Sequence, residues 1–311
     1  MSPVNHILVV VNPKGGDRQS PVDKAMILAR GMHASVELLI CDLAPRSRCA
    51  ALSLIPWEEP VPVVLADALL EKLAAPLRAQ GIEVTLRVVR GEALHLSILE
   101  YLHCSNASLL VKETHHHSWA RRTLLKNTDW YLAHGSTVPL LLTKEGAWAR
   151  PPKIMAAIDP HSDKAGGAAL NRKILRCATS LAVGLTAELH VIHTYIPRAL
   201  AAAVATGALP ATADIAQNLE CETSFKQAQI RSLARASGAA CDDVHVEIGS
   251  PTERLAHSVE QYGIDVAAIG ASSHGLWHRM IAGSTASAVL ESLPCDLLVV
   301  RPDINALVDA G

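Results

Sequence analysis

The sequences HILVVVNP at residues 6–13 and KIMAAIDP at residues 153–160 decide the fold. Each is an unbroken apolar run that stops at Asn-Pro or Asp-Pro, which is typical of a buried strand that ends in a turn. Their recurrence at an offset of 147 (153 minus 6) predicts that the chain contains one structural module twice.

The remaining elements recur in the same order. Helical stretches are predicted at 25–31 and 170–184. Further strands are predicted in pairs at 37–41 and 188–192, 84–91 and 244–249, 107–111 and 265–269, and 139–143 and 296–300. Strands alternating with helices imply right-handed βαβ crossovers. We therefore predict an α/β fold with two tandem doubly wound domains, each on a five-stranded parallel sheet, at 1–148 and 151–311, joined by a Gly/Pro linker.

The composition is that of a folded protein, with 311 residues of which 50% are hydrophobic and 19% charged. Lys and Arg number 28 against 30 Asp and Glu, so no single-sign charge attracts nucleic acid or a membrane surface. The chain begins without a basic and apolar leader, and it contains no apolar run long enough to span a bilayer. We expect a cytoplasmic protein whose seven scattered cysteines are reduced.

Residues 44–65 and 196–213 form an unusual segment after each predicted second strand, and the later one is rich in Ala, Val, Leu and Thr. One interpretation is a helical excursion that caps the edge of the sheet. A second is a lid over an apolar ligand between the two copies. A third is a surface for a homodimer.

The fourth strand of the second copy runs into GASSHGLWHRMIAGSTAS, residues 270–287. Gly270 lets the backbone approach a ligand, and Gly283 with Ser284 and Thr285 offers backbone N–H groups and hydroxyls before a helical run. Helix N-termini of this kind bind anions, and the carboxyl ends of parallel strands are where open α/β sheets bind ligands. The loop predicts a triphosphate site; the alternative is that its glycines shape turns and Ser284 is an ordinary N-cap.

These residues resemble the signature of the universal stress protein family: a glycine, two residues, a glycine, nine residues, then a glycine with Ser or Thr. Gly270, Gly283 and Ser284 match it. Ser273 departs from it by standing at the second glycine, and Gly275 lies two residues further on. The resemblance covers essentially the whole chain twice and implies that ATP, together with Mg²⁺, is the ligand.

In that family, the carboxylate that ends the first strand and a residue of the second strand lie beside the adenosine. By position, the resemblance implicates Asp159 and Val191, although an aspartate after a strand is also common as a turn residue. The full set of predicted nucleotide-binding residues is Ala157, Ile158, Asp159, Val191, Gly270, Ser272, Ser273, Gly275, Gly283, Ser284 and Thr285.

The first copy resembles the E-type tandem members of the family through KETH at 112–115 and TDW at 128–130. By position, Lys112 and Leu125 replace the glycines at 270 and 283, and Asn12 replaces the carboxylate. The first copy is therefore expected to lack the ATP site. The resemblance also implies a pseudo-dimer within one chain, with the last strand of each copy at the contact.

Three adjacent histidines at 115–117 raise a metal hypothesis, with His115 and His117 as the candidate ligands. Because adjacent side chains cannot all face one ion, a solvated loop is the favoured interpretation. His274 and His278, one helical turn apart in the matching loop, keep the metal hypothesis open.

The sequence contains no nucleophile elbow, no Walker-type loop and no paired-carboxylate motif. We therefore predict a protein that is not an enzyme, with ATP hydrolysis slow at most. Two functions of different classes remain, with an enzyme of the related nucleotide α-hydrolase-like group as a more distant third. The first is a nucleotide-sensing protein that changes the surface it offers to protein partners. The second is a structural or carrier module for an apolar ligand. Calorimetric titration with ATP, alongside Gly283→Val, separates them.

Overall fold

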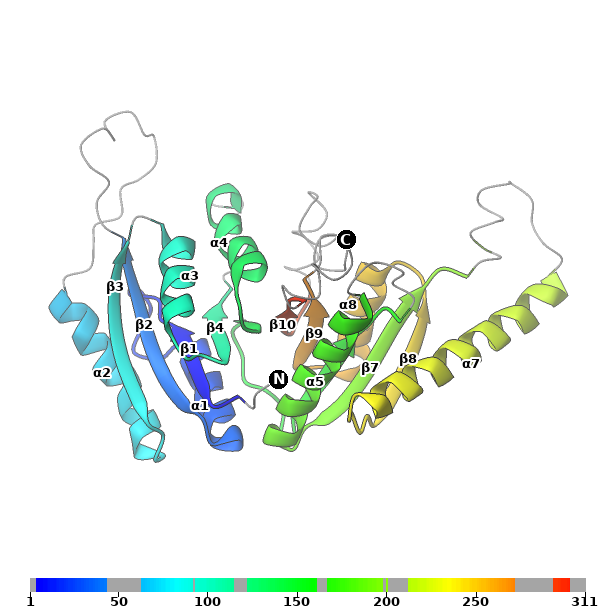
Figure 1. Ribbon diagram of the computed structural model, residues 1–311, viewed down its shortest axis with the longest axis horizontal. Coiled ribbons are helices and arrows are strands. Elements are labelled where there is room, and N and C mark those ends of the chain that lie inside the picture. Colours follow the sequence, from blue (N-terminus) through cyan, green and yellow to red (C-terminus); the bar gives the residue numbers. More distant parts are fainter. Residues whose placement is uncertain are drawn as a thin grey trace. The chain divides into compact units, whose positions relative to one another are not determined.

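The computed structural model describes residues 4–43, 63–91, 93–114, 122–160, 167–197, 200, 212–271 and 293–302. The chain folds as two compact units, Ser2–Ala147 and Trp148–Gly311. Each unit is a parallel five-stranded sheet with helices on both faces (Figure 1). The α/β fold class predicted from the sequence is confirmed.

The N-terminal unit has the strand order β3-β2-β1-β4-β5. Its elements are β1 (His6–Val10), α1 (Ser20–Met32), β2 (Ser35–Leu43), α2 (Val63–Ala79), β3 (Val84–Gly91), α3 (Leu94–Cys104), β4 (Leu109–Glu113), α4 (Arg122–Gly135) and β5 (Leu140–Thr143). Of the segment 44–65, for which a lid or dimer surface was considered, residues 44–62 lie outside the described part of the chain and residues 63–65 begin α2.

The C-terminal unit has the equivalent order β10-β9-β6-β7-β8. Its elements are β6 (Lys153–Ala157), α5 (Gly167–Leu185), β7 (Glu188–Tyr195), α7 (Thr212–Ala236), β8 (Asp243–Ile248), α8 (Pro251–Tyr262), β9 (Val266–Gly270) and β10 (Asp296–Val300). Most of the second unusual segment, residues 198–199 and 201–211, also lies outside the described residues.

The central strands are mostly apolar because helices cover both faces of each sheet. All five residues of β9 and of β10 are buried. Local signals set the helix ends: α8 begins at Pro251 and stops at Gly263, whose φ of 64° is left-handed, in line with the preference for proline in the first turn and glycine after the last.

Backbone hydrogen bonds give the equivalence of the two units residue by residue. Ser108 N–H donates to the carbonyl of His6 at 2.9 Å, and Asp265 N–H donates to that of Lys153 at 2.9 Å. His6 and Lys153 are equivalent at an offset of 147, so their hydrogen-bond partners Ser108 and Asp265 are equivalent at an offset of 157 (265 minus 108). The same offset makes Glu113 the counterpart of Gly270 (270 minus 157). The sequence-based pairing of Gly270 with Lys112 was therefore wrong by one residue.

The second strands are offset in the same way. Ile7 pairs with Val36 in one sheet and Ile154 pairs with Leu189 in the other. The counterpart of Glu37 is consequently His190. The sequence comparison had paired Glu37 with Glu188, two residues earlier. This equivalence becomes important below, because Glu37 and His190 each lie at the centre of a polar cluster.

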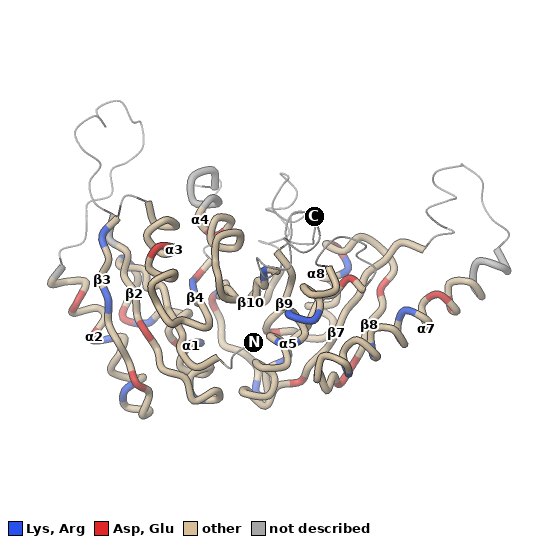
Figure 2. The backbone as a smooth tube through the Cα atoms, in the orientation of Figure 1, with Lys and Arg blue, Asp and Glu red and all other residues tan. Residues whose placement is uncertain are grey.

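Charges of both signs are interspersed over both units (Figure 2), as the balance of 28 basic and 30 acidic residues predicts. Among the described helices, none is long and apolar enough to cross a membrane.

Candidate functional site

The strand order of the C-terminal sheet reverses between β9 and β6. From β6 the chain builds outward through β7 to β8 and then returns to place β9 on the other side of β6. Such a reversal leaves a crevice at the carboxyl ends of the strands, and ligands of open α/β sheets bind there. The ends of β6 and β9, at Ala157 and Gly270, therefore mark the candidate site.

Asp159 lies at this edge, two residues after β6, and is exposed. The side-chain amide of Asn171, a buried residue of α5, holds its backbone. Asp159 N–H donates to Asn171 Oδ1 at 3.1 Å, and Asn171 Nδ2 donates to the Asp159 carbonyl at 2.6 Å. One buried side chain therefore engages both backbone groups of Asp159.

The two residues before Asp159 contribute shape. Ile158 is buried, its N–H donates to the carbonyl of Ile192 at 3.0 Å, and its own carbonyl lies 3.1 Å from Nδ1 of His193. Ala157 ends β6 and is half-buried. The Ile158 side chain is therefore part of the core beneath the candidate site, and its backbone groups are paired with residues of β7.

Val191 does not lie at this edge. It pairs with Ala156 in the middle of β7, and its side chain is 0% exposed. Beyond the level of Ala157, β7 continues for residues 193 to 195, of which Thr194 is half-buried and the other two are buried. The structure thus places the Val191 side chain inside the sheet, and its part in nucleotide binding stays a prediction; Thr194 is the half-buried residue at this end of β7.

Gly270 has a packing reason to be glycine. A Cβ atom at this position would lie 2.8 Å from Cδ2 of Leu170 and 3.1 Å from Cδ1 of Ile174, both on α5. Real side chains do not tolerate contacts this short, so the glycine lets α5 pack closely on the end of β9. The same close packing brings the N-terminal part of α5 to the edge where Asp159 lies.

Arg301 belongs to the same edge, although sequence reasoning did not single it out. It follows β10 directly, and the preceding residue, Val300, accepts a hydrogen bond from Ala271 N–H at 2.8 Å just past the end of β9. Arg301 is half-buried, and burial lowers the pKa of its guanidinium. The group stays charged at neutral pH because the ordinary pKa of arginine is so high. The signal that could have found it is a cation placed immediately after the last strand.

The remaining predicted ligands of the phosphate loop lie outside the described residues. They are Ser272, Ser273, Gly275, Gly283, Ser284 and Thr285. The histidines His115 and His117 of the metal hypothesis also lie outside them. The structure thus brings Ala157, Ile158, Asp159 and Gly270 together at one edge and leaves the loop itself as a prediction.

The N-terminal unit repeats the amide arrangement with different residues. Asn12 N–H donates to Gln19 Oε1 at 2.9 Å, and Gln19 Nε2 donates to the Asn12 carbonyl at 2.9 Å. Gln19 is buried, as Asn171 is. The backbone is therefore held in the same way in both units, but Asn12 carries a neutral amide where Asp159 carries a carboxylate.

The end of β4 also differs from the end of β9. Nζ of Lys112 lies 2.9 Å from Oδ1 of Asp129 on α4 and donates to the Glu113 carbonyl at 2.7 Å. This ion pair joins two of the sequence features that resemble E-type proteins. With Glu113 in the place of Gly270 and Lys112 committed to Asp129, this edge has a composition unlike that of the C-terminal unit.

Solved structures support the fold over the whole chain. A Pseudomonas aeruginosa PAO1 protein described as functionally unknown superposes with a TM-score of 0.68 at 24% identity, covering 99% of this chain and 95% of that one. A universal stress protein from Archaeoglobus fulgidus DSM 4304 gives a TM-score of 0.63 at 17% identity, covering 97% and 98%. These likenesses establish the tandem fold.

Sequence relatives point to the same family. Universal stress protein E of Escherichia coli strain K12 is 24% identical over 224 residues, 72% of this chain and 70% of that protein. The universal stress protein E homolog of Haemophilus influenzae is 24% identical over 242 residues, 75% of this chain and 73% of that protein. The sequence profile of the universal stress protein family matches residues 3–144 and again 152–301. The chain therefore belongs to the universal stress protein family, as a tandem member with two copies of the family domain.

Proposed function

We propose that this protein binds ATP, accompanied by Mg²⁺, at the edge of the C-terminal sheet between β6 and β9. It acts in the cytoplasm as a nucleotide-responsive stress protein and not as an enzyme. Nucleotide occupancy alters the loop after β9 and so the surface that the protein offers to partners. Membership of the universal stress protein family supports the proposal, and the chemistry of the described edge agrees with it.

The observation that carries the proposal is that Asp159 follows β6 and Arg301 follows β10, both at the carboxyl edge of the sheet whose strand order reverses beside β6. A carboxylate accepts hydrogen bonds from ribose hydroxyls or an exocyclic amine. A guanidinium binds phosphate oxygens through two parallel N–H groups. One edge therefore presents an acceptor for the nucleoside and a cation for the phosphates.

The test is calorimetric titration of the full chain with ATP, comparing Asp159→Ala with Asn12→Ala. Asp159→Ala is expected to weaken ATP binding about tenfold or more, the value of one charged hydrogen bond. Asn12→Ala changes the equivalent residue of the other unit and is expected to leave the affinity unchanged. Wild-type protein that takes up no ATP, or an equal loss in both variants, would overturn the proposal.

Arg301→Gln distinguishes phosphate contact from nucleoside contact. If Arg301 binds the phosphates, this variant loses affinity for ATP while its affinity for adenosine stays the same. Gly283→Val tests the predicted phosphate loop in the same titration. An Arg301→Gln variant that retains full ATP affinity removes this residue from the site.

A further inference from the structure

Two imidazoles and a carboxylate meet at the opposite, amino-terminal edge of the C-terminal sheet. His190 on β7 is paired with Asp243, the first residue of β8, and His245 lies two residues further along β8 on the same face of the sheet. One potential ligand atom from each of the three residues lies within 4.8 Å of the other two. None of the described residues at the carboxyl edge, where the nucleotide is proposed to bind, belongs to this cluster.

The spacing of the two imidazoles fits a shared metal ion. Nδ1 of His190 lies 3.1 Å from Nε2 of His245. Two nitrogens bound tetrahedrally to one zinc ion, each about 2.0 to 2.1 Å from the metal, lie about 3.3 Å apart. These two nitrogens share a hydrogen bond in the structure, and a metal ion would take the place of the shared hydrogen.

The second nitrogen of His190 gives an independent indication. His190 is 5% exposed, and its buried Nε2 has no hydrogen-bond partner among the described residues. Oε2 of Glu188 lies 3.7 Å from this nitrogen, just beyond hydrogen-bond distance. When Nδ1 binds a metal, Nε2 carries the proton and Glu188 becomes its natural acceptor, as in the carboxylate–histidine pairs that orient metal ligands.

Aromatic packing holds the ring of His245 in place. The ring stacks on Tyr262, the last residue of α8, with 4.1 Å between ring centroids.

We propose that His190, Asp243 and His245 bind one divalent transition-metal ion of the zinc class, with Glu188 positioning His190. Two nitrogens and one carboxylate form a donor set that suits zinc and is unlike the all-oxygen sets of calcium and magnesium. Asp243 is exposed and His245 half-buried, so a fourth position faces solvent, where water or an exogenous ligand completes the coordination.

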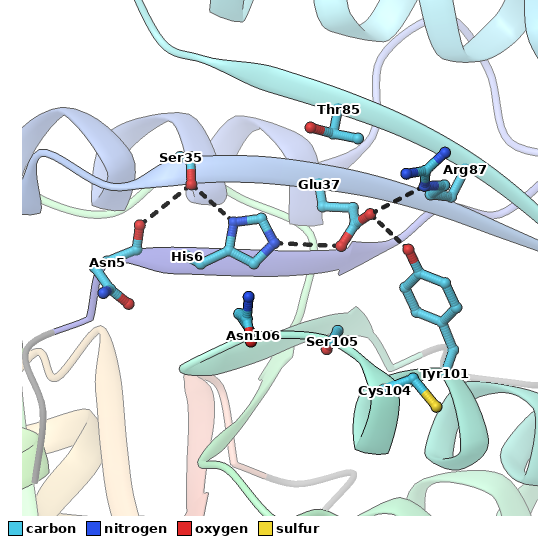
Figure 3. Close-up of a pocket in the computed structure, with 10 residues that line it drawn as sticks. All are labelled: Asn5, His6, Ser35, Glu37, Thr85, Arg87, Tyr101, Cys104, Ser105 and Asn106. Atoms are coloured by element: carbon cyan, nitrogen blue, oxygen red, sulfur yellow. Dashed lines mark hydrogen bonds and ion pairs between the residues drawn. The ribbon is translucent and has the colours of Figure 1, made fainter.

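The equivalent positions in the N-terminal unit carry different side chains. Its counterparts of His190 and His245 are Glu37 and Arg87. The Glu37 carboxylate lies 2.6 Å from Tyr101 Oη, 3.2 Å from His6 Nε2 and 3.6 Å from Arg87 Nε. Dashed lines in Figure 3 mark these contacts, and the residues line a pocket of about 470 Å³. The carboxylate there is held by a cation and two hydrogen-bonding groups, so this cluster has no need of a metal ion.

The experiment uses untagged full-length protein stripped with EDTA and titrated with Zn²⁺, and with Co²⁺ for its visible spectrum. Wild type is expected to bind one ion at this site, with a cobalt spectrum free of thiolate charge-transfer bands. His245→Ala is expected to lose that ion. The double variant His115→Ala/His117→Ala, which changes the histidines suggested by sequence alone, is expected to keep it.

Glu188→Gln tests the positioning role, since loss of such a partner weakens metal affinity about ten- to a hundredfold without removing the site. Circular dichroism and thermal melting of each apo variant check that it remains folded. Three outcomes overturn the proposal: no ion bound by wild type, an ion that persists in folded His245→Ala, or charge-transfer bands that reveal cysteine ligands. Titration with ATP is a separate measurement, so failure here leaves the nucleotide proposal unaffected.

Discussion

Asn171 and Gln19 have the same structural role in the two units. The side-chain amide of each makes two hydrogen bonds to the backbone of a residue just past the first strand. Neither lies at an obvious motif, because the partner residue is 12 positions away in one unit and 7 in the other. Both amides are buried. Removing a buried partner leaves the remaining donor and acceptor without compensation.

Asn171→Ala is therefore expected to lower the free energy of unfolding by about 1 to 3 kcal/mol. In urea denaturation the loss should appear in the C-terminal unit, and hydrogen exchange at the Asp159 amide should accelerate. Gln19→Ala is the matched variant, with the equivalent effect at Asn12. An Asn171→Ala protein with unchanged stability and unchanged exchange at Asp159 would contradict this role for the amide.

The cysteines should differ in reactivity according to their burial. Cys41 on β2 is buried, and burial raises its pKa to about 12, whereas Cys104 and Cys221 are exposed. Because the thiolate is the reactive form, iodoacetamide should label Cys104 and Cys221 in the native protein and leave Cys41 unmodified until urea is added. Peptide mass spectrometry reads this out. Rapid native labelling of Cys41 would show that β2 is not packed as described.

Packing between α5 and β9 gives a prediction about a whole element. Gly270→Val places methyl groups against Leu170 and Ile174, and such overpacking costs about 1 to 3 kcal/mol of unfolding free energy. Gly16→Ala is the control, since a Cβ there meets nothing within 4 Å, and it should change stability by less than about 0.5 kcal/mol. Equal urea midpoints for Gly270→Val and wild type would refute the close contact.

Strand identity was readable from the sequence, but strand register was not. Each predicted strand is present, because long apolar runs between turns leave few alternatives. Buried parallel strands lack the polar alternation that fixes register. The sequence alone therefore allows Leu109-Leu110-Val111 to be aligned with Val266-Ala267-Ala268 at more than one offset. This is why Lys112 was matched to Gly270 in place of Glu113.

The proposed metal cluster was also beyond sequence reasoning, for a related reason. The sequence-based metal hypothesis used adjacent histidines. His190 and His245 are separated by 55 positions and come together only because β7 pairs with β8. A usable signal did exist: each is a histidine flanked by apolar residues within a predicted strand. Such residues are worth comparing across neighbouring strands before any run of adjacent histidines.

The molecule as a whole is a duplication whose two copies have kept their backbone and diverged at both edges of the sheet. At the carboxyl edge, the C-terminal unit has Asp159 and Gly270 where the N-terminal unit has Asn12 and Glu113. At the amino edge, a histidine and carboxylate cluster stands against the network around Glu37. Because the fold is retained in both units while these side chains differ, we predict that ligand binding is asymmetric.

Equilibrium dialysis of full-length protein against labelled ATP measures this asymmetry as a stoichiometry. One nucleotide per chain is predicted, lost in Asp159→Ala and retained in Asn12→Ala. Two nucleotides per chain, or one that survives Asp159→Ala and disappears in Asn12→Ala, would contradict the assignment of the site to the C-terminal unit.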